Sequence, residues 1–147
     1  METKFNSQIC TSREQSKALL ALGLKKETAD CGHFYGRDEY EEGYYWDTII
    51  LNGGWQPYWD VTDNDIPAWS LHRLIEMMPL LLRKGDVYSL IYDIHRDWVA
   101  YMTYASGERN PYNRYLWESQ NTNTYDAFID CIEWLIKEGY FNKEYLV

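Results

Sequence analysis

Aromatic and acidic side chains gather in one short stretch that could bind a small ligand. Trp55, Tyr58 and Trp59 follow a Gly-Gly pair, and Asp60 and Asp63 come next in the chain. Flat rings beside carboxylates can hold sugars or cations, through stacking and through the attraction between a cation and an aromatic face. The alternative is that these rings pack against a sheet, as alternating aromatic residues usually do. The stretch therefore predicts a ligand site, with packing as the competing interpretation.

Cysteine and histidine are the usual ligands of zinc, and two of them lie close together in this chain. Cys31 and His33 have the spacing of a ligand pair, but a structural zinc site needs four ligands. The other candidates are far away in the sequence: Cys10, His72, His95 and Cys131. We therefore expect no metal site, and we expect the three cysteines to be free thiols.

The acidic cluster that includes Asp60, Asp63 and Asp65 does not match a calcium-binding loop. An EF-hand needs a glycine at its sixth position and a glutamate at its twelfth. Counted from Asp63, these positions hold Ala68 and Leu74. The acids fit the start of a helix better, because carboxylates stabilise the positive end of the helix dipole.

The sequence contains none of the motifs that position a nucleophile, a phosphate or a dinucleotide. It has no G-x-S-x-G, no H-E-x-x-H and no phosphate-binding glycine loop followed by lysine. Nucleophilic catalysis also needs a base beside the nucleophile, and no spacing in the chain indicates such a pair. We therefore expect a protein that is not an enzyme, with no catalytic residue and no cofactor.

Composition and charge restrict the partners of this chain. The net charge is −9 with only 14 Lys and Arg, whereas a nucleic-acid-binding protein needs a positive surface to neutralise phosphates. We therefore expect no direct binding of nucleic acid. Aromatic residues make up 17% of the chain, with 7 Trp and 14 Tyr, and exposed Tyr and Trp favour recognition surfaces for proteins.

Length and hydropathy indicate one soluble domain. No apolar run approaches the roughly 18 residues of a membrane span, and the polar start METKFNSQIC does not resemble a signal peptide. We therefore expect a cytoplasmic protein that does not contact the membrane. A chain of 147 residues is long enough for one core, so we expect a single α+β domain over residues 1–147.

The segment 87–105 has the pattern of a β-hairpin. A three-residue turn at 95–97 would pair Ile94 with Trp98 and would bring the apolar residues of both arms to one face. That face would hold Tyr88, Leu90, Tyr92, Ile94, Trp98, Ala100, Met102 and Tyr104. The opposite face would be more polar and therefore a candidate for binding, with Ser89, Asp93, Tyr101 and Thr103.

Helical periodicity predicts three helices, over residues 13–22, 67–78 and 125–138. Ser12 offers a capping box for the first helix, and Pro67 suits the first turn of the second. Each segment carries an apolar stripe that must be buried against another element. We therefore expect all three helices to pack on one face of a sheet.

Two further segments have the composition of strands. Residues 44–51 are rich in Tyr, Trp, Thr and Ile and are largely apolar on both faces, which favours an interior strand. Residues 112–118 can form another antiparallel strand. Together with the hairpin at 87–105, they predict one antiparallel sheet with the hairpin at its centre.

Three segments resemble a family of small uncharacterised proteins encoded by bacteriophages and by integrated elements of gut anaerobes. They are LLALGLKKETAD (residues 19–30), IPAWSLHRLIEMMP (66–79) and WLIKEGYFNKEYL (134–146). The resemblance implies a phage-borne accessory protein that acts in the bacterial cytoplasm. It implies no activity and no catalytic residue.

Three functional hypotheses follow. The first is a non-enzymatic accessory module, of the phage origin that the resemblance implies, that binds a protein through its aromatic surface. The second is a domain that binds a small ligand or carbohydrate at the stretch around Trp55 and Trp59. The third is an acidic mimic of nucleic acid, which requires rows of acidic side chains along one face.

Overall fold

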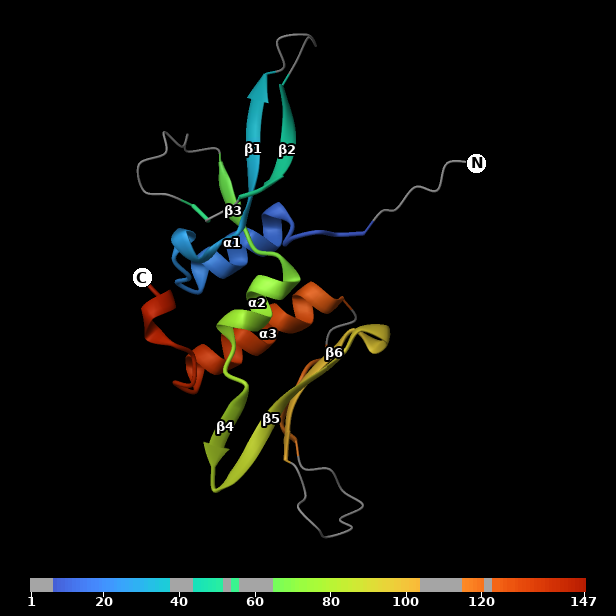
Figure 1. Ribbon diagram of the computed structural model, residues 1–147, viewed down its shortest axis with the longest axis vertical. Coiled ribbons are helices and arrows are strands. Elements are labelled where there is room, and N and C mark those ends of the chain that lie inside the picture. Colours follow the sequence, from blue (N-terminus) through green and yellow to red (C-terminus); the bar gives the residue numbers. More distant parts are fainter. Residues whose placement is uncertain (1–6, 38–43, 52–53, 56–64, 104–114, 121–122) are drawn as a thin grey trace. The chain divides into compact units, whose positions relative to one another are not determined.

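The computed structural model describes residues 7–37, 44–51, 54–55, 65–103, 115–120 and 123–147. Within these residues the chain forms α-helices and two antiparallel sheets, one of three strands and one of four, which confirms the expected α+β class. It divides into two compact units, unit 1 (Met1–Leu74 with Val147) and unit 2 (Ile75–Leu146), and Figure 1 labels their three α-helices and the strands β1 to β6. The single domain expected for residues 1–147 stays a prediction.

The sheet of unit 1 has the strand order β2-β1-β3. It consists of β1 (Cys31–Arg37), β2 (Tyr44–Ile50) and β3 (Ile66–Ala68), and both pairings are antiparallel. The strand expected near 44–51 is confirmed, but its expected place in one sheet with the hairpin is wrong. β2 pairs with β1 instead, because the pattern of a strand specifies which faces are apolar and not which strand lies beside it.

β2 lies at the edge of this sheet. Within the described residues it pairs with β1 alone. Ile49 and Ile50 point to opposite faces and are 42% and 65% exposed. The expectation of an interior strand is therefore wrong, although the strand is apolar on both faces.

Gly32 explains why β1 could not be recognised from its composition. A Cβ atom at Gly32 would lie 2.7 Å from the ring of Phe34 and 2.8 Å from the ring of Trp55. The missing side chain therefore leaves space for two aromatic rings to pack against the backbone of the strand. A glycine in a strand gives no hydrophobic signal, so the segment lacks the alternation by which strands are predicted.

The helix expected over residues 67–78 is shorter than predicted. Pro67 lies in β3, and α2 (Leu71–Met77) begins after Ser70. The carboxylate of Asp30 accepts hydrogen bonds from the Ser70 amide at 2.8 Å and from its hydroxyl at 2.5 Å, and the Ser70 hydroxyl accepts one from the Arg73 amide at 3.1 Å. Ser70 therefore starts the helix, and β3 is short enough to contain a proline at the edge of the sheet.

Trp69 anchors the core of unit 1. Its side chain is fully buried, and its indole nitrogen donates a hydrogen bond to the hydroxyl of Thr28 at 2.9 Å. Its backbone amide donates to the hydroxyl of Thr11 at 3.0 Å. Directly after Thr11, α1 (Arg13–Ala21) begins with the predicted capping box at Ser12, which confirms the first helix to within one residue.

The buried thiol of Cys31 is expected to make unit 1 less stable as the pH rises in the alkaline range. Burial, followed by the charge of Asp30, raises the pKa of its thiol from the ordinary 9.0 to about 12. The unfolded chain therefore loses this proton before the folded chain does. We expect the stabilisation to be complete below pH 9 and to be lost as the pH rises from 9 to 12. Chemical denaturation of the wild type over this range measures the decline in the free energy of unfolding.

The control for this prediction is Cys31→Ser, because a serine hydroxyl does not ionise in this range. The variant is expected to lose less stability between pH 9 and 12 than the wild type. Tyrosine ionisation affects both proteins equally, so it does not contribute to the difference between them. Equal slopes for the two proteins would contradict the role of the Cys31 thiol.

The sheet of unit 2 has the strand order β4-β5-β6-β7. Its strands are β4 (Leu81–Lys84), β5 (Asp86–Asp93), β6 (Trp98–Thr103) and β7 (Tyr115–Glu118), and all pairings are antiparallel. The hairpin predicted over 87–105 therefore forms the two central strands. The strand expected near 112–118 is confirmed over the part that the structure describes.

The register of the hairpin differs by one residue from the prediction. Asp93, and not Ile94, pairs with Trp98, because the connecting loop has four residues instead of three and contains a 3-10 turn (Ile94–Arg96). A shift of one residue moves every side chain of one strand to the other face. Tyr101 is therefore fully buried instead of lying on a polar face, and Met102 is on the opposite side of the sheet from Tyr101.

α3 (Thr124–Lys137) covers one face of this sheet, as Figure 1 shows. The helix was expected over 125–138, and its buried stripe includes Phe128 and Leu135. The ring of Trp134 stacks on Trp117 of β7 at 5.8 Å and lies 5.9 Å from Tyr101 of β6. Among the described residues, no helix is long and apolar enough to cross a membrane.

Replacing Asp97 with alanine is expected to destabilise unit 2. Asp97 has a φ of 51°, and its carboxylate accepts a hydrogen bond from the hydroxyl of Thr124 at the start of α3. Alanine lacks the polar side chain that makes this left-handed conformation tolerable, and the Thr124 hydroxyl loses its acceptor. We expect the free energy of unfolding to fall by about 2 kcal/mol, measured by urea denaturation.

Asp97→Gly separates the two causes, because glycine adopts this conformation without strain while it also removes the carboxylate. It should be more stable than Asp97→Ala. An alanine variant as stable as the wild type would show that neither the backbone conformation nor the hydrogen bond to Thr124 contributes.

Candidate binding site

Only one residue of the predicted ligand stretch lies in the described part of the chain. Trp55 is 3% exposed, its indole nitrogen donates to the carbonyl of Cys31 at 2.7 Å, and its ring stacks on Phe34 at 5.4 Å. Trp55 thus packs in the core of unit 1 and has no free ring face for a ligand. The remaining members lie outside the described residues: Tyr58, Trp59, Asp60 and Asp63. A ligand site at this stretch therefore stays a prediction.

The four-stranded sheet has a second face, which points away from α3 and which we call the open face. Tyr101 and Trp117 are paired across β6 and β7 and both contact α3, so their sequence neighbours point to the other side. Several apolar side chains of the open face are strongly exposed, at 54%, 44% and 43%: Leu81, Val87 and Tyr115. Ile91, Trp98 and Met102 are partly exposed on the same face.

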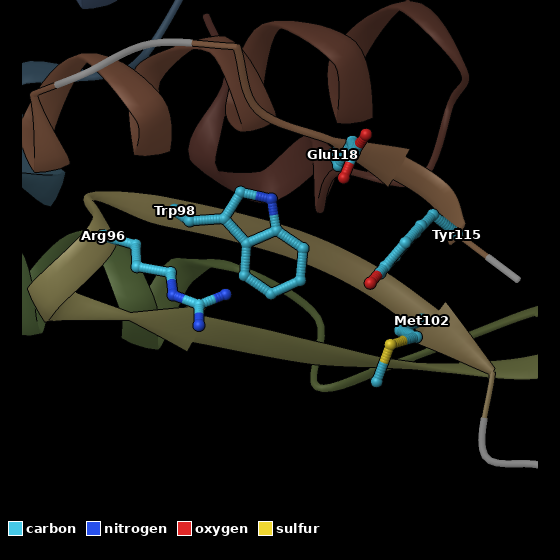
Figure 2. Close-up of a pocket in the computed structure, with 5 residues that line it drawn as sticks. All are labelled: Arg96, Trp98, Met102, Tyr115 and Glu118. Atoms are coloured by element: carbon cyan, nitrogen blue, oxygen red, sulfur yellow. The ribbon is translucent and has the colours of Figure 1, made fainter. Parts of the chain in front are cut away.

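The open face is hollowed between β6 and β7 (Figure 2). The hollow has a volume of about 440 Å³ and is lined by Arg96, Trp98, Met102, Tyr115 and Glu118. The rings of Trp98 and Tyr115 meet edge to face, with their centroids 5.6 Å apart and an interplanar angle of 88°. The hollow thus places aromatic surface from two rings beside a thioether, which is a surface suited to an apolar or cationic group.

Two charged side chains of opposite sign line this hollow. Arg96 forms an ion pair with Asp93 at 3.6 Å across three positions of the chain, but its side chain is 82% exposed, so the pair contributes little. The side chain of Glu118 forms no hydrogen bond or ion pair within the described residues. Its carboxylate is therefore the group in the hollow that can form an ion pair with a positively charged ligand group.

A second hollow of about 400 Å³ lies on the other side of Glu118, against α3. Its walls include the stacked rings of Trp117 and Trp134 and the carboxylates of Asp130 and Glu133. Glu133 is paired with Lys137 at 3.4 Å. Both hollows thus combine indole rings with carboxylates, and both are lined by Glu118 at the end of β7.

The described residues do not bring together a group that could bind a metal ion. Within them, no three His, Cys, Asp or Glu side chains are arranged to hold a metal ion. His33 lies near Cys10, with 4.0 Å between Nε2 and Sγ, but Nε2 is also 2.7 Å from the carbonyl of Thr11. The imidazole N–H is therefore directed at a backbone oxygen and does not activate the thiol.

The sequence predicted that most residues of the hollow lie in strands, but it did not predict that they lie on the open face of the sheet. Trp98 and Met102 were expected on the covered face of the hairpin, and the register shift places them on the open face. Tyr115 and Glu118 were expected only as part of a strand. The signal that would have placed them is the loop of the hairpin, where Asp97 can adopt a left-handed conformation and so allow a four-residue connection.

Comparisons of this chain with protein-family models, with curated proteins and with solved structures find no match in any of the three.

Proposed function

We propose that this protein is a non-enzymatic binding module that takes a partner protein on its open face. The partner presents a lysine or arginine side chain, flanked by apolar residues, to the hollow between β6 and β7. The observation that carries the proposal is the edge-to-face pair of Trp98 and Tyr115 beside the carboxylate of Glu118, which has no charged or hydrogen-bonding partner among the described residues. A bacterial cytoplasmic setting and a phage origin belong to the same proposal.

The side-chain types of the open face support a protein partner. Tyr, Trp, Met and Arg are enriched at the centres of protein interfaces, and Trp, Tyr and Arg are the residues whose truncation most often weakens binding. Trp98, Met102, Tyr115 and Arg96 gather in one hollow, and exposed Leu81 and Val87 extend the apolar surface along the sheet. A partner segment that lies across the strands would bury all of them.

Charge supports a basic partner. A cation above an aromatic ring face is attracted by the ring, and the attraction is stronger where a carboxylate lies beside it. Glu118 supplies that carboxylate, and the net charge of −9 favours the approach of a positive surface over long range. Arg96 is directed to Asp93, which reduces its repulsion of an incoming cation.

The test uses two short peptides that differ in one charge, acetyl-Leu-Lys-Leu-amide and acetyl-Leu-Gln-Leu-amide. Binding is followed by NMR through the indole N–H of Trp98, which is assigned by its loss in Trp98→Phe. We expect saturable shifts with the lysine peptide and about fivefold weaker binding with the glutamine peptide. Glu118→Gln should lower the affinity for the lysine peptide by a similar factor.

Glu144→Gln is the matched control, because it removes an exposed carboxylate of the same unit outside the hollow. Its affinity should equal that of the wild type. Equal binding of both peptides, or an unchanged affinity in Glu118→Gln, would overturn the assignment of a basic partner. Absence of any shift at Trp98 would overturn the open face as the binding site.

A small-ligand or carbohydrate site is the second candidate, and the hollow itself favours it. Its volume of about 440 Å³ is in the range of small-molecule sites, and Trp98 and Tyr115 could stack on a sugar ring. Titration with a panel of glycans and nucleotides, followed at the same indole N–H, tests this function. A panel without any response would contradict it while leaving the protein partner in place.

A further inference from the structure

Two of the three cysteines meet in the core of unit 1. Cys10 lies just before α1 and Cys31 begins β1, and they are 3% and 1% exposed. Together with Ala68 they form one buried cluster, and each cysteine influences the pKa of the other. Both are free thiols in the structure. The fold brings them together although 20 residues separate them along the chain. Cys131 is equally buried but lies in unit 2.

The surroundings explain why the two thiols are inert while they are buried. Burial raises the pKa of Cys10 and raises that of Cys31 to about 12, where Asp30 and Cys10 add to the effect. The imidazole of His33 is held between the carbonyl of Thr11 and the hydroxyl of Thr48, at 2.7 and 2.9 Å. Its two ring nitrogens are therefore engaged by these oxygens and are not directed at the Cys10 thiol as a base.

Cys10 would be exposed by local opening of its segment, without unfolding of the whole protein. It lies in the segment 7–12, where Ile9 is 52% exposed. The contacts that hold this segment include two hydrogen bonds between Thr11 and Trp69, at 2.8 and 3.0 Å. Local opening of such a segment requires less free energy than global unfolding. In the opened form the Cys10 thiol is in water and ionises normally.

We propose that Cys10 and Cys31 are a reversible redox pair that forms a disulfide bond when the protein meets a small disulfide such as oxidised glutathione. Cys10 loses its proton to water and its thiolate attacks one sulfur of oxidised glutathione, which forms a mixed disulfide and releases one glutathione. Cys31 then loses its proton and attacks the sulfur of Cys10, which releases the second glutathione. Two electrons pass to glutathione, and the two protons end on the released thiols.

The bond would tie the segment before α1 to the first strand of the sheet. The closed loop runs from Cys10 to Cys31 and contains all of α1. A crosslink of this kind removes conformations from the unfolded chain and stabilises the fold if its geometry is unstrained. The oxidised protein should therefore have a higher thermal midpoint than the reduced protein, by several degrees.

The experiment incubates the full chain with oxidised and reduced glutathione at several ratios. Free thiols are then alkylated in denaturant, and the intact mass and the tryptic peptides are measured. We expect one alkylated thiol, at Cys131, and a disulfide between the tryptic peptides 5–13 and 27–37. The bond should form in native buffer at a rate that small amounts of denaturant do not raise steeply.

Cys131→Ser is the matched control and should form the same linked peptides. Cys10→Ser and Cys10→Ala should form no linked peptides, and circular dichroism checks that they are folded. Three alkylated thiols at every ratio, or glutathione adducts without the internal bond, would overturn the proposal. So would oxidation that appears only when the denaturant unfolds the protein, because Cys10 would then lack a local route to solvent.

Discussion

Trp69→Ala is expected to lower the free energy of unfolding by about 3–5 kcal/mol, which is the usual loss for a buried tryptophan replaced by alanine. The indole is fully buried, so its removal leaves a cavity in unit 1. It also removes the hydrogen bond from the indole to the hydroxyl of Thr28, which keeps only its bond to the Lys25 carbonyl, and the loss of a buried hydrogen bond adds to the effect. Chemical denaturation followed by far-UV circular dichroism measures the change.

Trp98→Ala is the control, because it makes the same tryptophan-to-alanine substitution at a partly exposed position. Its ring lies on the open face, so its removal leaves no enclosed cavity and should cost about 1 kcal/mol. If both variants lost equal stability, Trp69 would not be the anchor of its core. If unit 1 and unit 2 unfold in separate transitions, Trp69→Ala should shift only one of them.

Tyr101→Ala is expected to have a comparable effect on unit 2. Tyr101 is fully buried beneath α3, near the ring of Trp134, and its hydroxyl donates to the carbonyl of Pro79 at 2.7 Å. Burial also raises the pKa of this phenol, so it stays protonated at neutral and moderately alkaline pH. We expect a loss of about 3–5 kcal/mol by urea denaturation, since a large aromatic side chain leaves the core.

Two phenylalanine variants separate the ring from the hydroxyl. Tyr101→Phe keeps the ring but leaves the Pro79 carbonyl without its donor, and it should cost about 1–2 kcal/mol. Tyr115→Phe removes a hydroxyl from a side chain that is 43% exposed and should change stability by less than about 0.5 kcal/mol. A Tyr101→Phe variant as stable as the wild type would show that the hydrogen bond to Pro79 is dispensable.

Local signals predicted the helices at the two ends of the described chain well. The capping box at Ser12 and the apolar stripe around Phe128 are contained within a few consecutive residues. Such signals act through hydrogen bonds and packing along a single helix, so they can be recognised without knowing the partner element. The hairpin was found for the same reason, because its two strands are neighbours in the chain.

Features that depend on distant residues were not predictable. Pro67 suggested a helix start, but its place in β3 depends on pairing with β1, more than 30 residues earlier. Ser70 starts α2 through a carboxylate from Asp30, which is equally distant. Local propensity is a weak guide where long-range pairing satisfies the backbone in another way.

The candidate site followed the same rule. Aromatic composition suggested a recognition surface, which stays a prediction, and it directed attention to Trp55, which is buried. Which of the two faces of β6 is open depends on the length of one loop. A single residue in that loop therefore decides whether Trp98 or Tyr101 lies on the surface.

β2 pairs with β1 alone among the described residues, and this edge position is expected to make the aggregation of the protein depend on ionic strength. An edge strand is a template for the backbone of another copy, and exposed Ile49 and Ile50 add apolar contact area. Asp47 is the one charged residue in the strand, so long-range repulsion between copies comes mainly from the net charge of −9. Salt at about 0.1 M screens such repulsion beyond roughly 10 Å. We therefore expect buffers of low salt to keep the molecules dispersed, and high salt to favour their aggregation through this strand.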